Sequence, residues 1–236
     1  MSRIDDLNRF YGILDELRDA VGGHRYLKHC NGRSGWPERG VYFFFEQGER
    51  RENRRELRVT RVGTHALKAG SGTSLWNRLS QHRGTVGGNR AGGGNHRGSI
   101  FRLHVGTALL ARSHYPTEIG QTWGRASSAG RDVVEAEHPL ELDISEFIGS
   151  MPFLWLGVLD SSGPDSARGV IEANAVGLLS NRGGAPIDPP SPKWLGCHAG
   201  SPAVRESGLW NVNYVDARHD PSFLDVLAEH VRRTDF

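Results

Sequence analysis

Two short apolar segments decide how this chain folds, GVYFFF at residues 40–45 and LRVTRVG at residues 57–63. Both are rich in the β-branched and aromatic residues that favour strands, and the charged stretch at residues 47–56 connects them as a long hairpin turn. Sequential strands of this kind usually pair antiparallel. The segment SLWNRLSQH at residues 74–82 follows with helical spacing. We therefore predict two antiparallel strands followed by a helix.

Apolar periodicity predicts further helices and one more strand on either side of this unit. Residues 152–159, PFLWLGVL, have the length and apolar density of a buried central strand. One helix is expected over residues 3–21, and a second one begins at Thr73 or Ser74 as its N-cap. The segment from Ser99 to about Leu110 is expected to be a helix, with a strand as the alternative. Two more helices are expected from Ser166 to about Leu179 and after Asp220-Pro221.

The remaining segments lack such periodicity. Residues 22–39 form a loop before the first strand, and residues 84–98 hold seven glycines. The glycine-rich segment either presents backbone N–H groups to phosphate or is a plain linker. Residues 111–139 are expected to be irregular. Residues 182–218 are expected to have low regularity, except that SGLWNVNY at 207–214 predicts a packed strand.

Length and composition bound the class of protein. A chain of 236 residues with 37% hydrophobic residues can bury a core, and we expect one compact unit over residues 1–236. No apolar run reaches the roughly 18 residues that a membrane span needs, and the N-terminus lacks the apolar centre of a secretion signal. Cys30 and Cys197 are far apart and have no Cys-x-x-Cys spacing, so they give no disulfide framework. Such cysteine usage is typical of a protein in a reducing compartment. We expect a cytoplasmic protein without a membrane partner.

Charge is distributed unevenly along the chain. Residues 1–104 hold 19 Lys and Arg against 10 Asp and Glu, a net charge of +9, whereas residues 105–236 hold 10 against 17, a net charge of −7. The basic excess lies between Arg50 and Arg102, around the two strands and the helix. Such clustering is typical of a polyanion partner, because neutralised phosphates release condensed counterions. A solvated basic face on an ordinary protein is the alternative.

Arg78 and His82 are spaced i and i+4, so both project from one side of the predicted helix, beside the apolar stripe of Leu75, Trp76 and Leu79. Arginine grips two phosphate oxygens at once, and histidine donates to phosphate or exchanges a proton near neutral pH. The pair therefore indicates a phosphate site, with a solvated polar flank of the helix as the alternative.

Glu172 shares a helix face with Val176 and Leu179, at i, i+4 and i+7. A carboxylate on a packing face is costly unless a metal or an arginine accompanies it. Such an oxygen ligand suits one Mg²⁺, whose octahedral coordination is completed by waters and phosphate oxygens. The alternative is an ordinary ion pair with Arg168 one turn earlier, worth about 0.2–0.5 kcal/mol.

In this order, the segments resemble the GIY-YIG nuclease superfamily, and within it the restriction-enzyme branch. Gly40-Val41-Tyr42 matches the first motif strand, and Arg61-Val62-Gly63 stands where the second motif strand belongs. The other matches are single side chains, Arg78 for the family arginine, His82 for a histidine of the restriction-enzyme branch, Glu172 for the metal-binding glutamate and Asn181 for the terminal asparagine. The resemblance implies an α/β fold of the α+β type, in which helices flank a small central antiparallel sheet.

The resemblance also implies an activity, the metal-dependent endonucleolytic hydrolysis of DNA phosphodiester bonds. Tyr42 would be the general base, as phenolate or by relaying its proton, and without the motif it would be interpreted as an ordinary strand aromatic. Arg78 would stabilise the transition state, Glu172 would hold Mg²⁺ or Mn²⁺, and His82 would assist Tyr42 or bind phosphate. Arg61 replaces the second motif tyrosine and is expected to join the catalytic set by contacting phosphate.

The implied nuclease core covers about residues 38–181, preceded by the helix at 3–21 and followed by a C-terminal extension at 182–236. Double-stranded DNA is the expected partner, and the oligomeric state is left open, a dimer included. The long segment between Arg78 and Glu172, which holds the glycine-rich loop, the helix from Ser99 and residues 111–150, is a candidate insertion for DNA recognition, as in the restriction-enzyme branch. Contacts with DNA are expected from Arg61, Lys68, Arg83, Arg97 and Asn181, with a solvated loop as the alternative for Arg97.

Two other functions stay compatible with the residues. One is a nucleic-acid-binding protein that kept the scaffold but lost cleavage, which the arginine at position 61 allows, and the other is a structural or partner-binding domain. Asn211 and Asn213 either read bases or are satisfied structural amides. The dipeptides His29-Cys30 and Cys197-His198 hold four zinc-ligand side chains, but without familiar zinc spacing, so no zinc site is predicted.

Overall fold

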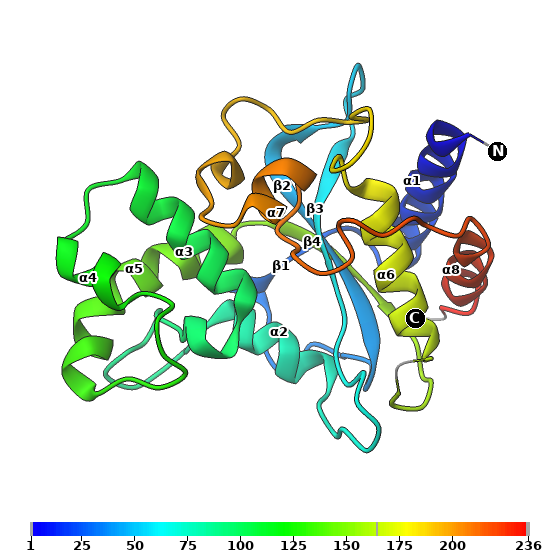
Figure 1. Cartoon of the computed structure of the whole chain (residues 1–236). Helices are drawn as coiled ribbons and strands as arrows, with labels where there is room; N and C mark the ends of the chain where they lie inside the picture. Colours follow the sequence, from blue (N-terminus) through cyan, green and yellow to red (C-terminus); the bar gives the residue numbers. More distant parts are fainter. Residues whose placement is uncertain (1, 164, 235–236) are drawn as a thin grey trace.

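A four-stranded antiparallel sheet with the strand order β1-β4-β2-β3 forms the centre of the molecule (Figure 1). The structure is a computed structural model, and it describes residues 2–163 and 165–234. The strands are β1 (Arg25–Tyr26), β2 (Gly40–Arg50), β3 (Leu57–Gly63) and β4 (Pro152–Gly157). The predicted antiparallel pairing of β2 with β3 is confirmed, and so is the central position of β4.

Eight α-helices surround this sheet within the described residues. They are α1 (Arg3–Ala20), α2 (Leu75–Arg83), α3 (Ile100–Arg112), α4 (Thr117–Thr122), α5 (Arg131–Gly149), α6 (Ala167–Leu179), α7 (Pro202–Ser207) and α8 (Phe223–Arg232). Short 3₁₀ turns occur at Leu27–His29, His96–Gly98 and Leu195–His198. The predicted α+β class is confirmed. Among the helices described, none has both the length and the apolar character needed to cross a bilayer.

Alternate residues of β2 face two separate hydrophobic clusters. Val41 and Phe43 pack with α1, α6 and α8 on one face of the sheet, whereas Tyr42 and Phe44 pack with α2, α3 and α5 on the other. Figure 1 shows these two groups of helices on opposite sides of the strands. Because both faces are covered, β2 and β4 are apolar at successive positions and show no alternation with polar residues. This double burial explains why the strands appear in the sequence as continuous apolar runs.

Serine side chains begin three of the predicted helices. Ser74, Ser99 and Ser166 each accept a hydrogen bond from the backbone N–H three residues later, at 3.1, 3.3 and 3.2 Å. Each bond satisfies one of the backbone donors that the first helical turn leaves free. The predicted starts of α2, α3 and α6 are therefore confirmed, with Ser74 rather than Thr73 as the cap of α2.

The prediction that residues 111–139 are irregular is wrong, because they include α4 and the first half of α5. Pro139 lies inside α5, where a proline removes a backbone donor and normally ends a helix. Two buried positions of α5 are the glutamates Glu137 and Glu141. Their charges are paired with arginines of the 3₁₀ turn at His96–Gly98 and of α3. A search for apolar periodicity therefore misses this helix.

The segment at 207–214 is not the predicted strand, because Ser207 ends α7 and a loop follows. The loop runs along β3, where Trp210 N–H donates to Thr60 O at 2.7 Å. Tyr214 has a φ of 63°, outside the extended region. The loop thus lies beside the edge strand of the sheet without extending it by regular pairing.

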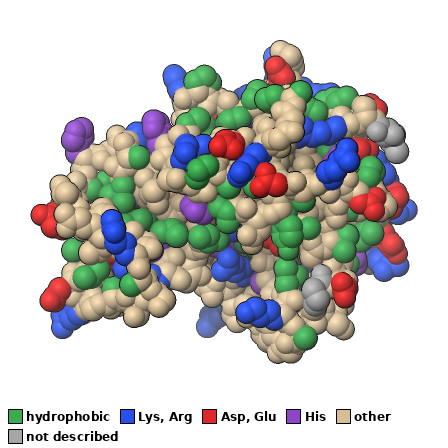
Figure 2. Space-filling model, viewed as in Figure 1, with side chains coloured by type: hydrophobic (Ala, Val, Ile, Leu, Met, Phe, Trp, Pro, Cys, Tyr) green, Lys and Arg blue, Asp and Glu red, His purple; other side chains and the backbone are tan. Residues whose placement is uncertain are grey.

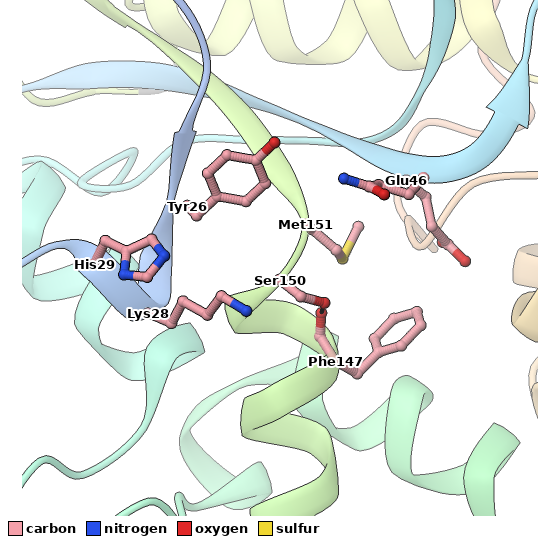
Figure 3. A pocket seen from close by; sticks show the side chains of 8 residues that line it. Tyr26, Lys28, His29, Glu46, Phe147, Ser150 and Met151 are labelled. Carbon is pink, nitrogen blue, oxygen red and sulfur yellow. Dashed lines mark hydrogen bonds between the residues drawn. The ribbon is translucent and has the colours of Figure 1, made fainter.

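Glu46 of β2 holds two tryptophans of the C-terminal segment. Its Oε2 accepts hydrogen bonds from Nε1 of Trp194 at 3.0 Å and from Nε1 of Trp210 at 3.2 Å. Glu46 also lines a cavity of about 480 Å³ together with Lys28 and Phe147 (Figure 3). Burial raises the pKa of this carboxyl from 4.5 to about 7. The folded state therefore binds this proton more tightly than the unfolded chain, and ionisation of Glu46 costs stability as the pH rises from 4.5 through about 7.

Glu46→Gln should relieve this cost, since the amide oxygen of glutamine also accepts the two indole N–H groups. We expect the melting temperature of the variant to exceed that of the wild type by more at pH 8 than at pH 5. The increase should be about 2–4 °C for each kcal/mol of ionisation cost that the substitution removes. Thermal denaturation followed by circular dichroism measures the difference. Glu52→Gln, at an exposed position of the hairpin, is the control and should show no such trend. A Glu46→Gln effect that is the same at both pH values would contradict the interpretation.

Candidate active site

One cavity of about 530 Å³ is lined by four side chains that come from four separate elements. They are Tyr42 of β2, Arg61 of β3, Arg78 of α2 and Glu172 of α6. The elements converge because β2 and β3 are neighbours in the sheet, α6 packs against both strands, and α2 begins after the loop that leaves β3. Four of the five side chains predicted to be catalytic therefore share one cavity.

The fifth, His82, lies behind Tyr42. The phenol of Tyr42 has no exposed surface, and its Oη lies 2.8 Å from Nε2 of His82. Nδ1 of the same imidazole lies 2.8 Å from Oγ of Ser99. Burial, and then the charges of three nearby arginines, hold the pKa of His82 well below its usual value, so the ring is neutral at pH 7. His82 is buried and is not among the lining residues, so its position favours contact with Tyr42 over contact with a phosphate in the cavity.

Two arginines bring positive charge to the cavity. Arg61 donates from Nη1 to Trp210 O at 2.6 Å, and its guanidinium lies 4.7 Å from the centre of the Phe101 ring. Arg78 donates from Nη1 to Gln81 Oε1 at 2.9 Å. These acceptors are neutral, and within residues 2–163 and 165–234 neither arginine forms an ion pair. Both charges therefore remain available to an anion in the cavity.

Glu172 is half-buried in the cavity wall. Burial raises the pKa of its carboxyl, and this effect is partly opposed by the charges of the cavity arginines and by a backbone hydrogen bond from Thr64. Arg168, the alternative partner one turn earlier, forms its ion pair with Asp160 instead. The carboxylate of Glu172 is therefore not paired with Arg168 of its own helix.

Close approaches explain the glycines of the two motif strands. Tyr42 and Gly63 are paired across β2 and β3, and a Cβ on Gly63 would lie 2.3 Å from Oη of Tyr42. A Cβ on Gly40 would lie 2.3 Å from Leu156 O of β4. Real side chains do not approach so closely, so only glycine lets the phenol lie across the end of β3.

The structure does not place Asn181 at the cavity. Its Oδ1 accepts the backbone N–H of Ile187 at 2.8 Å, and the side chain is buried away from the lining residues. Asn211 and Asn213 line the cavity instead. Asn211 is a structural amide, since it accepts from Val62 N–H at 3.1 Å and donates to Val62 O at 2.8 Å. Asn213 is exposed. Position in space therefore favours the loop asparagines over Asn181 as the neighbours of a substrate.

Two further residues predicted to contact DNA, Lys68 and Arg83, differ in how close they lie to this cavity. Lys68 is exposed on the loop after β3, whose residues Leu67 and Thr73 line the cavity. Arg83 lines another cavity, and its guanidinium lies 6.0 Å from the centre of the Trp76 ring. Lys68 is therefore placed at the rim of the candidate site, and Arg83 on a different flank of α2.

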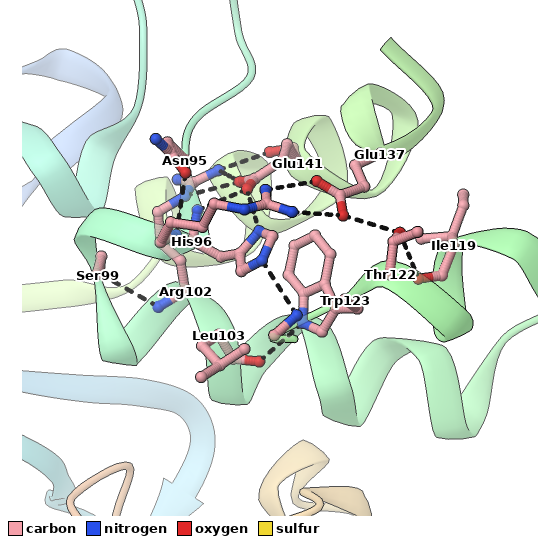
Figure 4. Close-up of polar contacts among 12 residues, drawn as sticks. Asn95, His96, Ser99, Arg102, Leu103, Ile119, Thr122, Trp123, Glu137 and Glu141 are labelled. Atoms are coloured by element: carbon pink, nitrogen blue, oxygen red, sulfur yellow. Dashed lines mark hydrogen bonds and ion pairs between the residues drawn. The ribbon is translucent and has the colours of Figure 1, made fainter. Parts of the chain in front are cut away.

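Arg97 is occupied by a carboxylate. Its Nη1 and Nη2 donate to the two oxygens of Glu137 at 2.7 and 3.0 Å, and Glu137 also accepts from Thr122 at 3.0 Å (Figure 4). Binding a phosphate would require this two-point ion pair to break. The prediction that Arg97 contacts DNA is therefore not supported by its position, and it serves to join the glycine-rich segment to α5.

Other arginines of the basic half are also paired with acidic residues. Arg51 pairs with Asp188 at 2.7 Å and Arg58 with Glu49 at 2.8 Å. On the face shown in Figure 2, basic side chains are scattered among acidic and uncharged ones and form no single patch. Part of the basic excess in the sequence is therefore used for buried structural ion pairs, whereas the two arginines of the cavity form none among the described residues.

Thr64 and His65 also line the cavity, and no motif singles them out in the sequence. Nε2 of His65 accepts from Gly40 N–H at 3.3 Å, and Nδ1 donates to Thr73 O at 2.8 Å. Burial lowers the pKa of His65 to about 4, which keeps the ring neutral for both bonds. The imidazole therefore ties both ends of the loop at residues 66–73 to the start of β2.

The two cysteine–histidine dipeptides, His29-Cys30 and Cys197-His198, lie in different segments of the chain. Within the described ranges, no three or more His, Cys, Asp or Glu side chains are grouped so that they could hold a metal. Cys30 is buried and its thiol donates to Tyr26 O at 3.2 Å, whereas Cys197 is exposed. The two cysteine–histidine dipeptides therefore have separate surroundings.

Gly63→Ala tests the close approach of the phenol. The added methyl group would displace the Tyr42 ring from its position between Gly63 and His82, and we expect a loss of about 1–3 kcal/mol in the free energy of unfolding. Chemical denaturation measures this loss. Gly72→Ala is the matched control, because a Cβ there meets nothing within 4 Å. Equal stability of the two variants would show that the approach is not as tight as described.

The comparison with protein families agrees with the order of these residues. The family model described as GIY-YIG domain matches residues 1–236. The searches of curated proteins and of solved structures each gave no match. Since the family model spans every residue, the chain belongs to the GIY-YIG domain family.

Proposed function

We propose that this protein is an endonuclease that hydrolyses phosphodiester bonds of double-stranded DNA. The observation that carries the proposal is the shared cavity of Tyr42, Arg61, Arg78 and Glu172, which joins a phenol, two unpaired guanidinium groups and a carboxylate. Phosphodiester hydrolysis needs a base for the attacking water, positive charge for the pentavalent transition state and support for the leaving oxygen. Membership of the GIY-YIG domain family supports a nuclease-type function in general.

The two arginines are suited to hold the scissile phosphate. Both lie at the cavity wall with neutral acceptors only, so a phosphate would be their first anionic partner among the described groups. Arg61 is fixed by Trp210 O and the Phe101 ring, which keeps its guanidinium in place before substrate binds. Preorganised donors of this kind stabilise a developing charge without rearrangement during the reaction. In this proposal Arg78 stabilises the transition state and Arg61 binds a phosphate oxygen.

Tyr42 is the proposed general base. Tyr42 is among the residues that line the cavity, and the neutral imidazole of His82 is the one hydrogen-bond partner of its oxygen in residues 2–163 and 165–234. The phenol has no exposed surface, so an attacking water would have to enter beside it to use the second hydrogen-bonding position of this oxygen. The close approach to Gly63 leaves the ring no room to turn away.

Glu172 fits a divalent cation of the Mg²⁺ or Mn²⁺ type. It is a hard oxygen ligand, it lies in the cavity wall, and its own helix gives it no ion pair. One carboxylate is a common protein contribution to Mg²⁺, which keeps several waters. When bound, the cation would supply charge to the phosphate and to the leaving oxygen. Burial raises the pKa of Glu172, and a bound cation would oppose this effect by stabilising the carboxylate.

Arg61 also supports the alternative of a protein that binds nucleic acid without cutting it. The residue replaces the second tyrosine of the motif, and its guanidinium is held by Trp210 O and stacked on Phe101. An arginine so placed binds phosphate but does not accept a proton at neutral pH. Cleavage itself separates the two functions.

Metal-dependent nicking of supercoiled plasmid is the direct test. We expect the wild type to cut in Mg²⁺ or Mn²⁺ and to stop when EDTA is added. Tyr42→Phe, Arg78→Ala and Glu172→Gln should each reduce the rate by about 100-fold or more, because each removes one group of the reacting set. Glu135→Gln is the control, since Glu135 lies on the surface of α5 in a pair with Arg131. Binding without cutting by the wild type would favour the alternative.

DNA binding distinguishes free from paired basic residues. Lys68→Ala should weaken binding of an uncleaved duplex about equally for all sequences and lower the salt slope by about one. Arg97→Ala should leave binding unchanged but destabilise the fold, because it leaves Glu137 buried without its partner. Fluorescence anisotropy at several salt concentrations and thermal denaturation measure the two effects. The reverse pattern would place DNA over the glycine-rich segment.

A further inference from the structure

Ser99 contacts the imidazole of His82 on the side away from Tyr42. Its Oγ lies 2.8 Å from Nδ1 of His82 and also accepts the backbone N–H of Arg102 at 3.3 Å, as the N-cap of α3 (Figure 4). Ser99 is 1% exposed and His82 has no exposed surface. Both hydrogen bonds of the imidazole are therefore made with buried protein groups.

The single proton of the Ser99 hydroxyl decides which nitrogen of His82 carries hydrogen. A buried hydroxyl is expected to donate this proton to an acceptor. In the described part of the chain, Nδ1 of His82 is the acceptor that Ser99 Oγ reaches. If Nδ1 carried the hydrogen, Oγ would accept two hydrogen bonds and its own proton would be buried without a partner, which is unfavourable. Nδ1 is therefore the acceptor, and the neutral ring carries its hydrogen on Nε2.

We propose that Ser99 is a positioning residue whose hydroxyl fixes His82 in the Nε2–H tautomer, so that His82 donates a hydrogen bond to the phenol oxygen of Tyr42 and does not accept its proton. The 2.8 Å contact between Nε2 and Oη is then an N–H···O bond. The hydrogen of the phenol is left to point into the cavity that Tyr42 lines.

The insertion between α2 and β4 holds this arrangement. Arg102 of α3 donates from Nη1 to His82 O at 2.8 Å, and its Nε donates to Glu141 of α5 at 2.9 Å. Glu141 in turn accepts from the ring of His96 at 3.0 Å (Figure 4). Ser99 therefore reaches the imidazole while Arg102, three residues later, holds the backbone of the same histidine. The two contacts fix both the position and the rotation of the ring.

This inference deepens the proposed function and rests on it for its catalytic meaning. A hydrogen bond donated by neutral His82 stabilises the phenolate form of Tyr42. The phenol first gives its own proton, which points into the cavity, to water there. The phenolate then takes a proton from the attacking water, so that an O–H bond of this water breaks, the phenol O–H forms again, and hydroxide attacks phosphorus. The hydrogen of His82 stays on Nε2 throughout, so no proton moves into the protein interior.

Nitrogen NMR of the histidines tests the tautomer in the whole protein without requiring cleavage. Long-range ¹H–¹⁵N spectra of ¹⁵N-histidine-labelled protein at pH 7 should show, for His82, a protonated Nε2 and an unprotonated Nδ1. The His82→Gln spectrum identifies the signal among the 11 histidines. A protonated Nδ1 would overturn the proposal, even if the protein cuts DNA. A protein that fails to cut but shows the expected tautomer would contradict the nuclease function alone.

Variants with matched chemistry test the role of the donor. Ser99→Ala should move the Nδ1 resonance and lower nicking by about 10-fold, whereas Ser99→Thr keeps a hydroxyl and should keep the tautomer. Ser2→Ala also removes an N-cap serine, from α1, and should change neither. Glutamine places an N–H near the position of Nε2 but accepts no proton at this pH, so His82→Gln should retain nicking to within about 10-fold, unlike His82→Phe. Equal inactivity of His82→Gln and His82→Phe would show that His82 accepts the proton.

Discussion

The antiparallel register of β2 against β3 sets the geometry around the cavity. It pairs Tyr42 with Gly63, and because Gly63 has no side chain, the phenol crosses the end of β3 and reaches His82 on α2. A shift by one residue would turn Tyr42 into the cluster formed with α1, α6 and α8 and would bring Val41 or Phe43 to the cavity instead. Burial of β2 on both faces opposes such a shift, since the residues from Val41 to Phe45 are all buried, alternately on the two sides.

Six of the arginines between residues 51 and 102 divide into two groups by their partners. Arg51, Arg58, Arg97 and Arg102 each pair with a carboxylate, and these pairs join distant segments, such as the hairpin to the C-terminal region and the glycine-rich segment to α5. Removing one partner of a buried pair leaves an uncompensated charge, so these arginines are constrained by stability. Arg61 and Arg78 lack such partners among the described residues and lie at the cavity. Pairing in space, and not net charge along the sequence, distinguishes these four arginines from the two at the cavity.

The sequence predicts those parts of this protein that follow from local patterns. The strands of the hairpin, β4 and the serine-capped helices have such patterns, because double burial gives continuous apolar runs and a cap needs a hydroxyl at one position. The helix α5 does not, since Glu137, Glu141 and Pro139 interrupt its apolar stripe and its glutamates are balanced by arginines distant in sequence. The same limit affects the site. Tyr42, Arg78 and Glu172 stand at motif positions, whereas the contact of Ser99 with His82 and the position of Asn213 depend on how the insertion and the C-terminal loop pack.

Arg61 shows how one substitution changes the electrostatics of the whole cavity. A tyrosine at this position would be neutral, whereas a guanidinium is charged at any physiological pH. Its charge opposes the effect of burial on Glu172 and also disfavours protonation of His82, so it favours the ionised carboxylate and the neutral imidazole together. Both are the forms that the proposed chemistry uses, one to hold a cation and the other to donate to the phenol. The chain thus replaces a hydroxyl of the motif by a fixed positive charge, which acts against the effect of burial at Glu172 and together with burial at His82.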